Sequence, residues 1–241
     1  MRQPVSVCMA TYNGARFVAD QLRSILYQLQ DDDEVVVSDD GSRDETLAII
    51  RAFADHRIRI LERTGRPRGP VANFGHALAH ARYDIIFLSD QDDLWFEHKV
   101  ETVVRLLQES DLVVTDCTLI DEKGRELVGS FFERHRSRPG FWANLVRNSY
   151  LGCCMAFRRS LLEKALPIPL QVPMHDIWLG MLAEWYGRPC FHPEPLVAYR
   201  RHDTAVSTTG ARSTNSLWQK IALRCRLLLC LAQRILQRRA P

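Results

Sequence analysis

Short apolar runs alternate along the chain with segments whose apolar residues recur every three or four positions. The runs are four to six residues long, as expected of buried strands, and lie at 5–10, 34–38, 58–61, 84–88, 112–117, 152–157 and 195–200. The periodic segments predict helices at 15–30, 43–53, 71–80, 96–109, 141–147, 160–165 and 176–186. Strands that alternate with helices form βαβ units, so the chain is predicted to be an α/β protein with a mostly parallel sheet.

Two further local features refine this pattern. Ser42 and Glu45 have the spacing of a capping box and predict the start of the second helix. The segment from Asp121 to Pro139 is polar and irregular, and we interpret it as a hairpin or a mobile loop beside a cleft.

The chain of 241 residues can form one large domain or two small ones. Its seven cysteines show no C-x-x-C spacing, which favours reduced thiols in the cytoplasm over a disulfide framework. The first predicted strand begins at Val5 with no leader-like apolar stretch before it, and no apolar run approaches the ~20 residues of a membrane-spanning helix. We therefore expect a cytoplasmic protein.

Charge is unevenly placed, although the net charge is only +3. Beyond Asp203 the charged residues are all basic: Arg212, Lys220, Arg224, Arg226, Arg234, Arg238 and Arg239. A helix is predicted at 216–239, with one apolar face formed by Leu217, Ile221, Leu228, Leu231 and Ile235 and with Arg234 on the opposite side. Such a helix could pack on the domain, on a second copy of the chain, or on an anionic membrane surface; nucleic acid is not the expected partner.

The acidic loop after the fourth predicted strand is the first candidate for chemistry. Asp90, Asp92 and Asp93 follow the run 85–88 directly. Ligands of open α/β sheets bind outside the carboxyl ends of the strands, and carboxylate oxygens suit Mg²⁺ or Mn²⁺. The loop therefore indicates a metal–diphosphate site. A solvated acidic loop that caps the next helix is the alternative, and it fits Asp93 best.

Polar residues also end the first and second predicted strands. Thr11-Tyr12-Asn13-Gly14 can offer backbone N–H groups to an anion, and Asp39-Asp40 can accept from a ribose or a base. Turn formation and helix capping explain Asp40 equally well. The sequence has neither G-x-G-x-x-G nor G-x-x-x-x-G-K-[ST], so dinucleotide-binding and P-loop proteins lose support.

The second half of the chain adds Asp176, Trp178 and His202 as candidates. Asp176 falls at a helix start, where it could act as a general base or simply cap the helix. Trp178 could offer its ring to a sugar. His202 ends the last strand, as the acids end earlier strands, and could bind a metal.

Taken in order, these motifs resemble the family-2 glycosyltransferases. The resemblance covers about residues 4–207 and rests on Thr11-Tyr12-Asn13, Ser38-Asp39-Asp40-Gly41-Ser42, Asn73-Phe74-Gly75, Asp90-Gln91-Asp92, Gly152-Cys153-Cys154, His175-Asp176 and Tyr199-Arg200-Arg201-His202. It implies the GT-A fold, an αβα sandwich, over residues 1–207, with a nucleotide-sugar-binding half (1–118) and an acceptor half (119–207). A basic amphipathic helical tail would occupy 208–241.

The resemblance also implies roles for individual residues. Asp92 and His202 would bind Mg²⁺ or Mn²⁺, and Asp176 would be the catalytic base, although many relatives have Glu where this chain has His175. The implied nucleotide-sugar site consists of Ala10, Thr11, Tyr12, Asn13, Asp39, Asp40, Asn73, Asp90 and Gln91. The implied acceptor side consists of Trp95, Cys153, His175 and Trp178.

The implied function is metal-dependent inverting transfer of a sugar from a nucleotide-diphospho-sugar, such as dTDP-rhamnose or a UDP-hexose. The expected acceptor is a lipid-linked or surface polysaccharide such as O-antigen, reached from the inner face of the bacterial plasma membrane. A homo-oligomer is compatible with the sequence. A nucleotidyltransferase and a non-catalytic glycan- or nucleotide-binding module are the alternatives.

Overall fold

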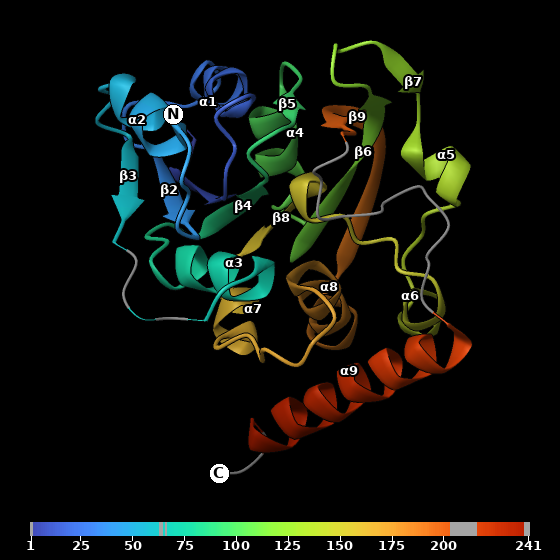
Figure 1. Cartoon of the computed structure of the whole chain (residues 1–241). Coiled ribbons are helices and arrows are strands. Elements are labelled where there is room, and N and C mark those ends of the chain that lie inside the picture. Colours follow the sequence, from blue (N-terminus) through green and yellow to red (C-terminus); the bar gives the residue numbers. More distant parts are fainter. Residues whose placement is uncertain (1, 63–64, 66, 203–215, 239–241) are drawn as a thin grey trace.

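The computed structural model describes residues 2–62, 65, 67–202 and 216–238. They form a nine-stranded sheet in the order β3-β2-β1-β4-β8-β6-β9-β5, with β7 paired to β6. Helices cover both faces of this sheet, so the predicted α/β sandwich is confirmed (Figure 1).

The first half of the sheet is parallel. Its strands are β1 (Val5–Thr11), β2 (Glu34–Asp39), β3 (Ile58–Leu61) and β4 (Ile85–Ser89), joined by α1 (Val18–Leu26), α2 (Thr46–Ala52) and α3 (Pro70–Ala79). β1, β2 and β4 are buried on both faces, which explains their continuous apolar runs. Their carboxyl ends therefore meet at one edge of the sheet.

The second half is mixed, and the mostly parallel arrangement is limited to the first half. β8 (Met155–Arg158) runs antiparallel to both β4 and β6 (Leu112–Ile120), whereas β9 (Pro189–Arg200) is parallel to β6. β5 (Leu94–Trp95) pairs with β9, and β7 (Glu126–Val128) forms a hairpin with β6. The polar segment after residue 121 is thus a hairpin, one of its two predicted forms.

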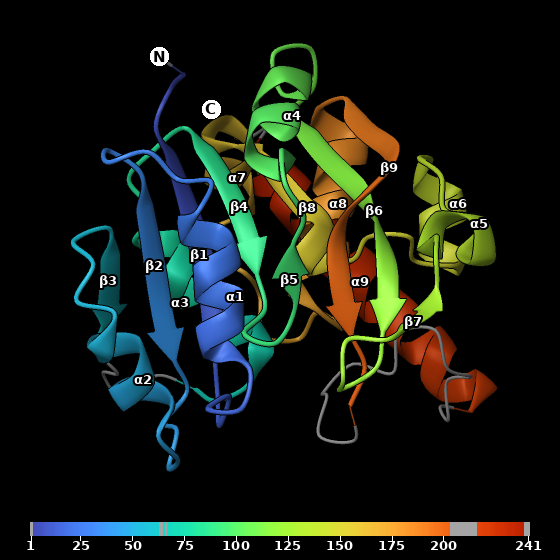
Figure 2. The same cartoon turned by 90° about the horizontal axis from the view of Figure 1, so that it is seen from above.

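The helices form layers on the two faces of the sheet. Helix α1 and α4 (Lys99–Leu106) lie on one face, and α3, α7 (Arg159–Ala165) and α8 (His175–Tyr186) lie on the other (Figures 1 and 2). Two short helices, α5 (Phe131–His135) and α6 (Phe141–Val146), follow the hairpin. Helix α9 (Leu217–Gln237) lies outside α8, at the bottom of Figure 1.

Several local predictions need correction. The predicted capping box at Ser42 and Glu45 is absent, because Ser42 donates its hydroxyl to Asp39 and α2 begins at Thr46. Helix α4 begins at Lys99 rather than Phe96, since Leu94 and Trp95 form a strand instead, and no side chain caps the helix. The predicted strand at 152–157 begins as a turn of 3₁₀-helix.

The predicted domain boundaries, at 118/119 and 207/208, stay predictions. The boundary between 207 and 208 lies outside the described residues, and the one between 118 and 119 falls inside β6. Both halves contribute to one hydrophobic core, which extends from Val5 to Leu231. None of the described helices is both long enough and apolar enough to cross a membrane.

Helix α9 packs on the domain, but its predicted apolar face is only partly right. Leu231 is buried as expected, whereas Leu217 and Ile221 are exposed. Arg234, predicted to point away, is buried and donates to the carbonyl oxygens of Lys164, Leu166 and Pro167 at 2.6–2.9 Å. These orphan carbonyls at the end of α7 attract the guanidinium, and no helical periodicity could reveal that contact.

Candidate functional site

The candidate site lies at the carboxyl edge of the parallel strands. In the sheet register Thr11 pairs with Asp39, and Met9 pairs with Ser89. The loops that follow β1, β2 and β4 are therefore neighbours, as the sequence predicted from their polar residues.

Asp39 shapes this edge from inside. Its carboxylate accepts hydrogen bonds from the backbone N–H groups of Gly41 and Ser42 at 2.8 and 2.7 Å. It also accepts from the hydroxyls of Thr11 and Ser42 at 2.9 and 2.5 Å. Asp39 and Thr11 are buried, so both predicted nucleotide contacts serve here to fix the β2 loop against β1.

Asn73 and Asp40 join α3 to the same edge. Asn73 donates from Nδ2 to the Thr11 carbonyl oxygen at 3.1 Å and accepts from the Ser38 hydroxyl at 2.8 Å. Asp40 accepts from the Gly69 backbone N–H at 2.8 Å, just before α3. Among the predicted nucleotide-sugar-binding residues, Tyr12 and Asn13 are exposed and are the most open to a ligand, whereas Ala10, Asp90 and Gln91 are half-buried.

Gln91, the middle residue of the acidic motif, connects two of the loops. Its Oε1 accepts from the Tyr12 backbone N–H at 2.8 Å, and its Nε2 donates to the Tyr12 carbonyl oxygen at 3.0 Å. A Cβ on Gly14 would lie 2.1 Å from Gln91 Oε1, so this amide needs the glycine beside it. The sequence predicted that Gln91 contacts the nucleotide-sugar. In the structure its side-chain amide forms two hydrogen bonds with the backbone of Tyr12.

We expect Gln91→Ala to weaken nucleotide-sugar binding about 10- to 30-fold, because two hydrogen bonds of about 1 kcal/mol each hold Tyr12 in place. Titration calorimetry with the nucleoside diphosphate measures this effect. Gln28→Ala is the matched control, since Gln28 also bridges two segments, bonding to Phe96 and Val100. Equal losses in both variants would contradict a specific role for Gln91.

The two predicted metal ligands lie together. His202 Nε2 is 2.7 Å from Asp92 Oδ2, although 110 positions separate the residues along the chain. The exposed fractions of the His202 and Asp92 side chains are 6% and 18%, so both side chains are largely shielded from solvent. The carboxylate oxygen of Asp92 suits Mg²⁺ or Mn²⁺, whereas the imidazole of His202 is a more usual ligand of softer transition metals.

The other acids of the loop carry an electrostatic cost. Burial, followed by the charges of Asp92 and Asp176, raises the pKa of Asp90 to about 8. Burial, followed by the charges of Asp92 and Asp90, raises the pKa of Asp93 well above its usual range. Asp93 Oδ2 is buried without a hydrogen-bond partner in the described chain. A divalent cation would relieve this repulsion, so the residues fit one.

A second set of potential ligands includes the two other acids of the same loop. One ligand atom each of Asp90, Asp93 and Cys153 lies within 4.8 Å of the others. A thiol is a soft ligand and a poor match for Mg²⁺, which argues against Cys153 as a ligand of that cation. Cys153 is buried and lies behind the acids rather than on an acceptor surface.

Two basic residues that the sequence did not reveal as site residues support the loop. Arg200 donates its backbone N–H to Asp93 Oδ1 and its Nε to the Asp92 carbonyl oxygen, both at 2.9 Å. Lys99 is fully buried, and its Nζ donates to the Cys153 carbonyl oxygen at 2.8 Å. Burial lowers the pKa of Lys99. Only the tertiary structure brings Arg200 and Lys99 close to the acidic loop.

Asp176 lies in the first turn of α8, near enough for its charge to raise the pKa of Asp90. Burial raises its pKa to about 7, against the lowering effect of backbone N–H groups that include those of Ile177 and Gly152. A carboxyl group with a pKa near neutrality is suited to accept a proton. Gly152 lies against the start of α8, since a Cβ on this residue would be 3.0 Å from His175 Nε2 and 3.7 Å from Asp176 Cβ.

His175 stacks on Phe74, with ring centroids 3.9 Å apart. Its ring is buried, and neither nitrogen has a hydrogen-bond partner among the described residues. Burial lowers its pKa to about 3, so the ring is neutral at physiological pH. His175 thus lies behind Asp176, and its predicted acceptor contact remains a prediction.

The predicted acceptor roles of two tryptophans are corrected. Trp178 is fully buried; its indole N–H donates to the Ala165 carbonyl oxygen, and Arg234 of α9 covers its ring at 5.3 Å. Trp95 is buried between Phe87 and Lys99, on the α1 side of the sheet. Neither ring can stack on a sugar beside Asp176, because both are parts of the core.

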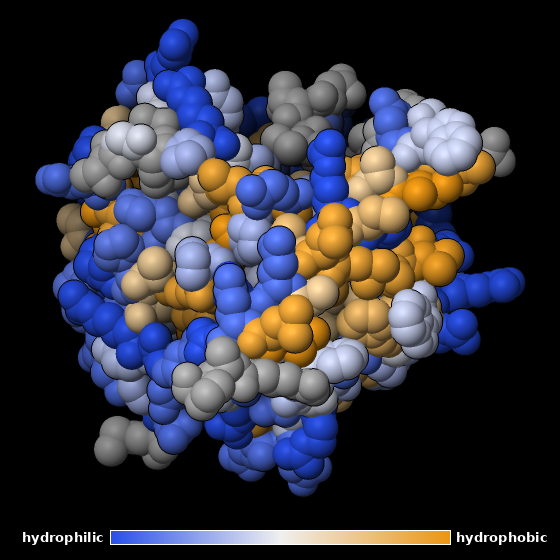
Figure 3. Space-filling view, turned by 90° about the horizontal axis from the view of Figure 1, so that it is seen from below, coloured by the Kyte–Doolittle hydropathy of each residue, from blue (hydrophilic) through white to orange (hydrophobic). Residues whose placement is uncertain are grey.

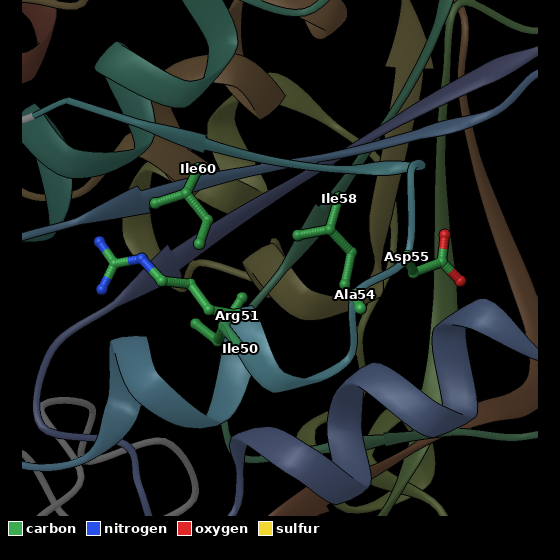
Figure 4. A pocket seen from close by; sticks show the side chains of 6 residues that line it. All are labelled: Ile50, Arg51, Ala54, Asp55, Ile58 and Ile60. Carbon is green, nitrogen blue, oxygen red and sulfur yellow. The ribbon is translucent and has the colours of Figure 1, made fainter.

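The pocket shown in Figure 4 is separate from this site. It has a volume of about 280 Å³ and lies between α2 and β3, lined by Ile50, Arg51, Ala54, Asp55, Ile58 and Ile60. Asp55 belongs to the loop that enters β3, at the opposite edge of the sheet from the acidic loop. Its carboxylate is already bonded to Arg57 at 2.7 and 3.0 Å.

Solved structures place the fold in a known class. TarS from S. aureus, in complex with UDP-GlcNAc, matches with a TM-score of 0.72 and 20% identity over 94% of this chain and 66% of that one. The mannosyltransferase PcManGT from Pyrobaculum calidifontis, in complex with GDP-Man and Mn²⁺, matches with a TM-score of 0.62 and 25% identity over 100% of this chain and 66% of that one. The class is that of the GT-A glycosyltransferases.

The family model described as glycosyl transferase family 2 matches residues 6–166, so the chain belongs to this family of enzymes. An uncharacterized glycosyltransferase of Nostoc sp. is 27% identical over 88% of this chain and 69% of the relative. The dTDP-rhamnosyl transferase RfbG of Shigella flexneri is 36% identical over 41% of this chain and 36% of the relative.

A third relative is the UDP-Glc:alpha-D-GlcNAc-diphosphoundecaprenol beta-1,3-glucosyltransferase WfgD of Escherichia coli, which is 24% identical over 75% of this chain and 70% of the relative. The matched regions thus span 36% of RfbG and 66–70% of the other four proteins.

Proposed function

We propose that the chain is a metal-dependent inverting glycosyltransferase that moves a sugar from a nucleotide-diphospho-sugar to a hydroxyl of a lipid-linked or surface polysaccharide. The observation that carries the proposal is the meeting of Asp90, Asp92, His202 and Asp176 at one edge of the sheet. Three elements far apart in the sequence supply them: the β4 loop, the end of β9 and the start of α8.

The residues divide the chemistry between them. Asp176 would take the proton from the acceptor hydroxyl as that oxygen attacks the anomeric carbon, because its pKa near 7 lets it accept a proton at physiological pH. Asp92 and His202 would hold Mg²⁺ or Mn²⁺, which supplies charge neutralisation for the departing diphosphate. The exposed loop with Tyr12 and Asn13 would hold the nucleotide.

A single displacement follows from this arrangement. The new bond forms from the acceptor oxygen to the anomeric carbon, while the bond from that carbon to the diphosphate oxygen breaks. One attack from the face opposite the leaving group inverts the anomeric centre. The charges of Asp92 and Asp176 both act on Asp90, so the proposed base and the acidic loop belong to one site, as a single displacement requires.

The relatives support the substrate classes. RfbG is named for a dTDP-rhamnosyl donor and WfgD for a diphosphoundecaprenol-linked acceptor. A donor such as dTDP-rhamnose or a UDP-hexose and a polyprenyl-diphosphate-linked acceptor fit this chain best. We also propose that α9 brings the enzyme to the inner face of the membrane on which such an acceptor is displayed.

A panel of nucleotide-sugars, scored by nucleoside diphosphate release, tests the proposal. We expect one or two donors to be turned over with Mg²⁺ or Mn²⁺, and excess chelator to abolish that release. Release that persists in chelator would remove the cation from the mechanism. Diphosphate released from an NTP and a sugar phosphate would instead identify a nucleotidyltransferase, and cation-dependent binding without any turnover would identify a binding module.

A further inference from the structure

Helix α9 has a second apolar face, opposite the one that packs on the domain. Trp218, Ile221, Cys225, Leu229, Ala232 and Leu236 recur at intervals of three or four and thus share one side of the helix. All six are exposed, whereas Leu227, Leu231 and Arg234 bury the other side. Packing on the domain therefore leaves this stripe open, which the sequence prediction of one apolar face did not anticipate.

The stripe continues onto neighbouring elements. Trp142 and Val146 of α6 are 72% and 79% exposed, and Arg224 of α9 donates to the Val146 carbonyl oxygen at 3.4 Å. Trp185, at the end of α8, contacts Phe141 with ring centroids 6.1 Å apart and is also exposed. Figure 3, which shows the underside of the molecule, has a broad apolar area where α9 lies.

This concentration is specific to one face. Eight of the thirteen large hydrophobic side chains exposed in the described chain belong to α6, to the end of α8 or to α9. We call this surface, formed by Trp142, Val146, Trp185, Leu217, Trp218, Ile221, Leu229 and Leu236, the apolar underside. Large exposed apolar patches mark contacts with proteins or membranes.

Charge distinguishes between these occupants. The described part of the C-terminal segment, 216–238, contains Lys220, Arg224, Arg226, Arg234 and Arg238 and no acidic residue. Two copies that met along α9 would bring like charges together without a compensating carboxylate. An anionic lipid surface would instead attract this basic helix, whose exposed Arg226 lies at the margin of the stripe. Tryptophans also favour the boundary between lipid headgroups and acyl chains.

We infer that the apolar underside inserts into the interface of an anionic phospholipid bilayer, with α9 lying parallel to the membrane plane. This inference deepens the proposed function, on whose membrane-displayed acceptor it rests. It assigns the contact to residues that the predicted face of α9 did not include, chiefly Trp218, Leu229 and Leu236.

Co-sedimentation of the full chain with phosphatidylglycerol vesicles tests this inference. The triple variant Trp218→Gln/Leu229→Gln/Leu236→Gln should lose at least about 100-fold in vesicle affinity, because three exposed apolar side chains no longer enter the interface. The matched control, Tyr27→Gln/Leu127→Gln/Leu170→Gln, removes equally exposed apolar side chains elsewhere and should bind as the unaltered chain does.

Three outcomes would overturn the inference: equal partition of the triple variant and the unaltered chain, equal binding to neutral phosphatidylcholine vesicles, or a dimer in solution that the triple variant dissociates. Binding should weaken as salt rises, and Lys220→Gln/Arg226→Gln should weaken it further. Nucleoside diphosphate release, measured in parallel, should be unchanged in the triple variant. Loss of vesicle binding with intact release separates this inference from the proposed chemistry.

Discussion

Asp176→Asn should lower the turnover number for sugar transfer by about 10²- to 10⁴-fold, the usual contribution of a positioned general base. Asparagine has nearly the same shape but cannot take the acceptor proton. Donor affinity, measured by calorimetry with the nucleoside diphosphate and Mn²⁺, should be nearly unchanged. In the unaltered enzyme kcat/KM should fall as pH drops through about 7, because protonation removes the base.

Stability provides the control for this variant. The pKa of Asp176 is about 7 in the folded chain and 3.8 in its ordinary state, so the folded form binds the proton more tightly. Stability from this group is therefore complete below about pH 4 and is lost as pH rises through about 7. The cost at pH 8 is at most about 4 kcal/mol, and less because the side chain is only half-buried.

Asp176→Asn escapes this cost and should unfold at a higher temperature than the unaltered chain at pH 8, but not at pH 4. A variant that is inactive and yet more stable cannot owe its inactivity to unfolding. Retained turnover would remove Asp176 from the role of base. Equal melting temperatures of the two proteins at pH 8 would show that burial does not raise the pKa of the Asp176 carboxyl group.

Asp92→Ala should abolish the dependence of donor binding on Mg²⁺ or Mn²⁺. Removing even an outer partner of a metal site lowers metal affinity about 10- to 100-fold, and Asp92 is proposed as a direct ligand, so the loss should be at least as large. Electron paramagnetic resonance of Mn²⁺ titrated with enzyme and nucleoside diphosphate measures binding without requiring turnover. His202→Ala should show the same direction of change, since His202 lies 2.7 Å from Asp92.

Asp84→Ala is the matched control for the metal assignment. Asp84 precedes the same strand, β4, at its opposite end, and its side chain is 72% exposed. This variant should bind Mn²⁺ and donor as the unaltered chain does. Undiminished Mn²⁺ binding by Asp92→Ala would instead point to Asp90, Asp93 and Cys153 as the ligands.

The arrangement of the parallel strands could be predicted because each strand leaves a local record. Runs that are buried on both faces read as continuous apolar stretches, and β1, β2 and β4 all do. Because parallel strands end at one edge, the acids at Asp39 and Asp90 could be expected to be neighbours. The antiparallel β8 between β4 and β6 could not, since strand direction leaves no trace in composition.

The supports beneath the site escaped prediction for a related reason. Arg200 contacts Asp92 and Asp93 across more than 100 positions, and Lys99 contacts Cys153 across 54. Nothing local distinguishes these residues from solvated surface cations. Trp178 shows the converse: an aromatic residue next to a candidate base suggested a sugar platform, but its neighbours on α7 and α9 bury it.

The burial of Trp178 has a consequence for acceptor choice. Asp176 and Trp178 lie in the first turn of α8, and Arg234 of α9 covers the tryptophan while bonding to the end of α7. The proposed base and the proposed membrane anchor therefore belong to one packed unit of the described residues. An enzyme anchored in this way would hold its proton acceptor at a constant height above the lipid headgroups. The enzyme would then select acceptors by the length of their lipid-linked saccharide, because it would extend only chains whose terminal hydroxyl reaches that height.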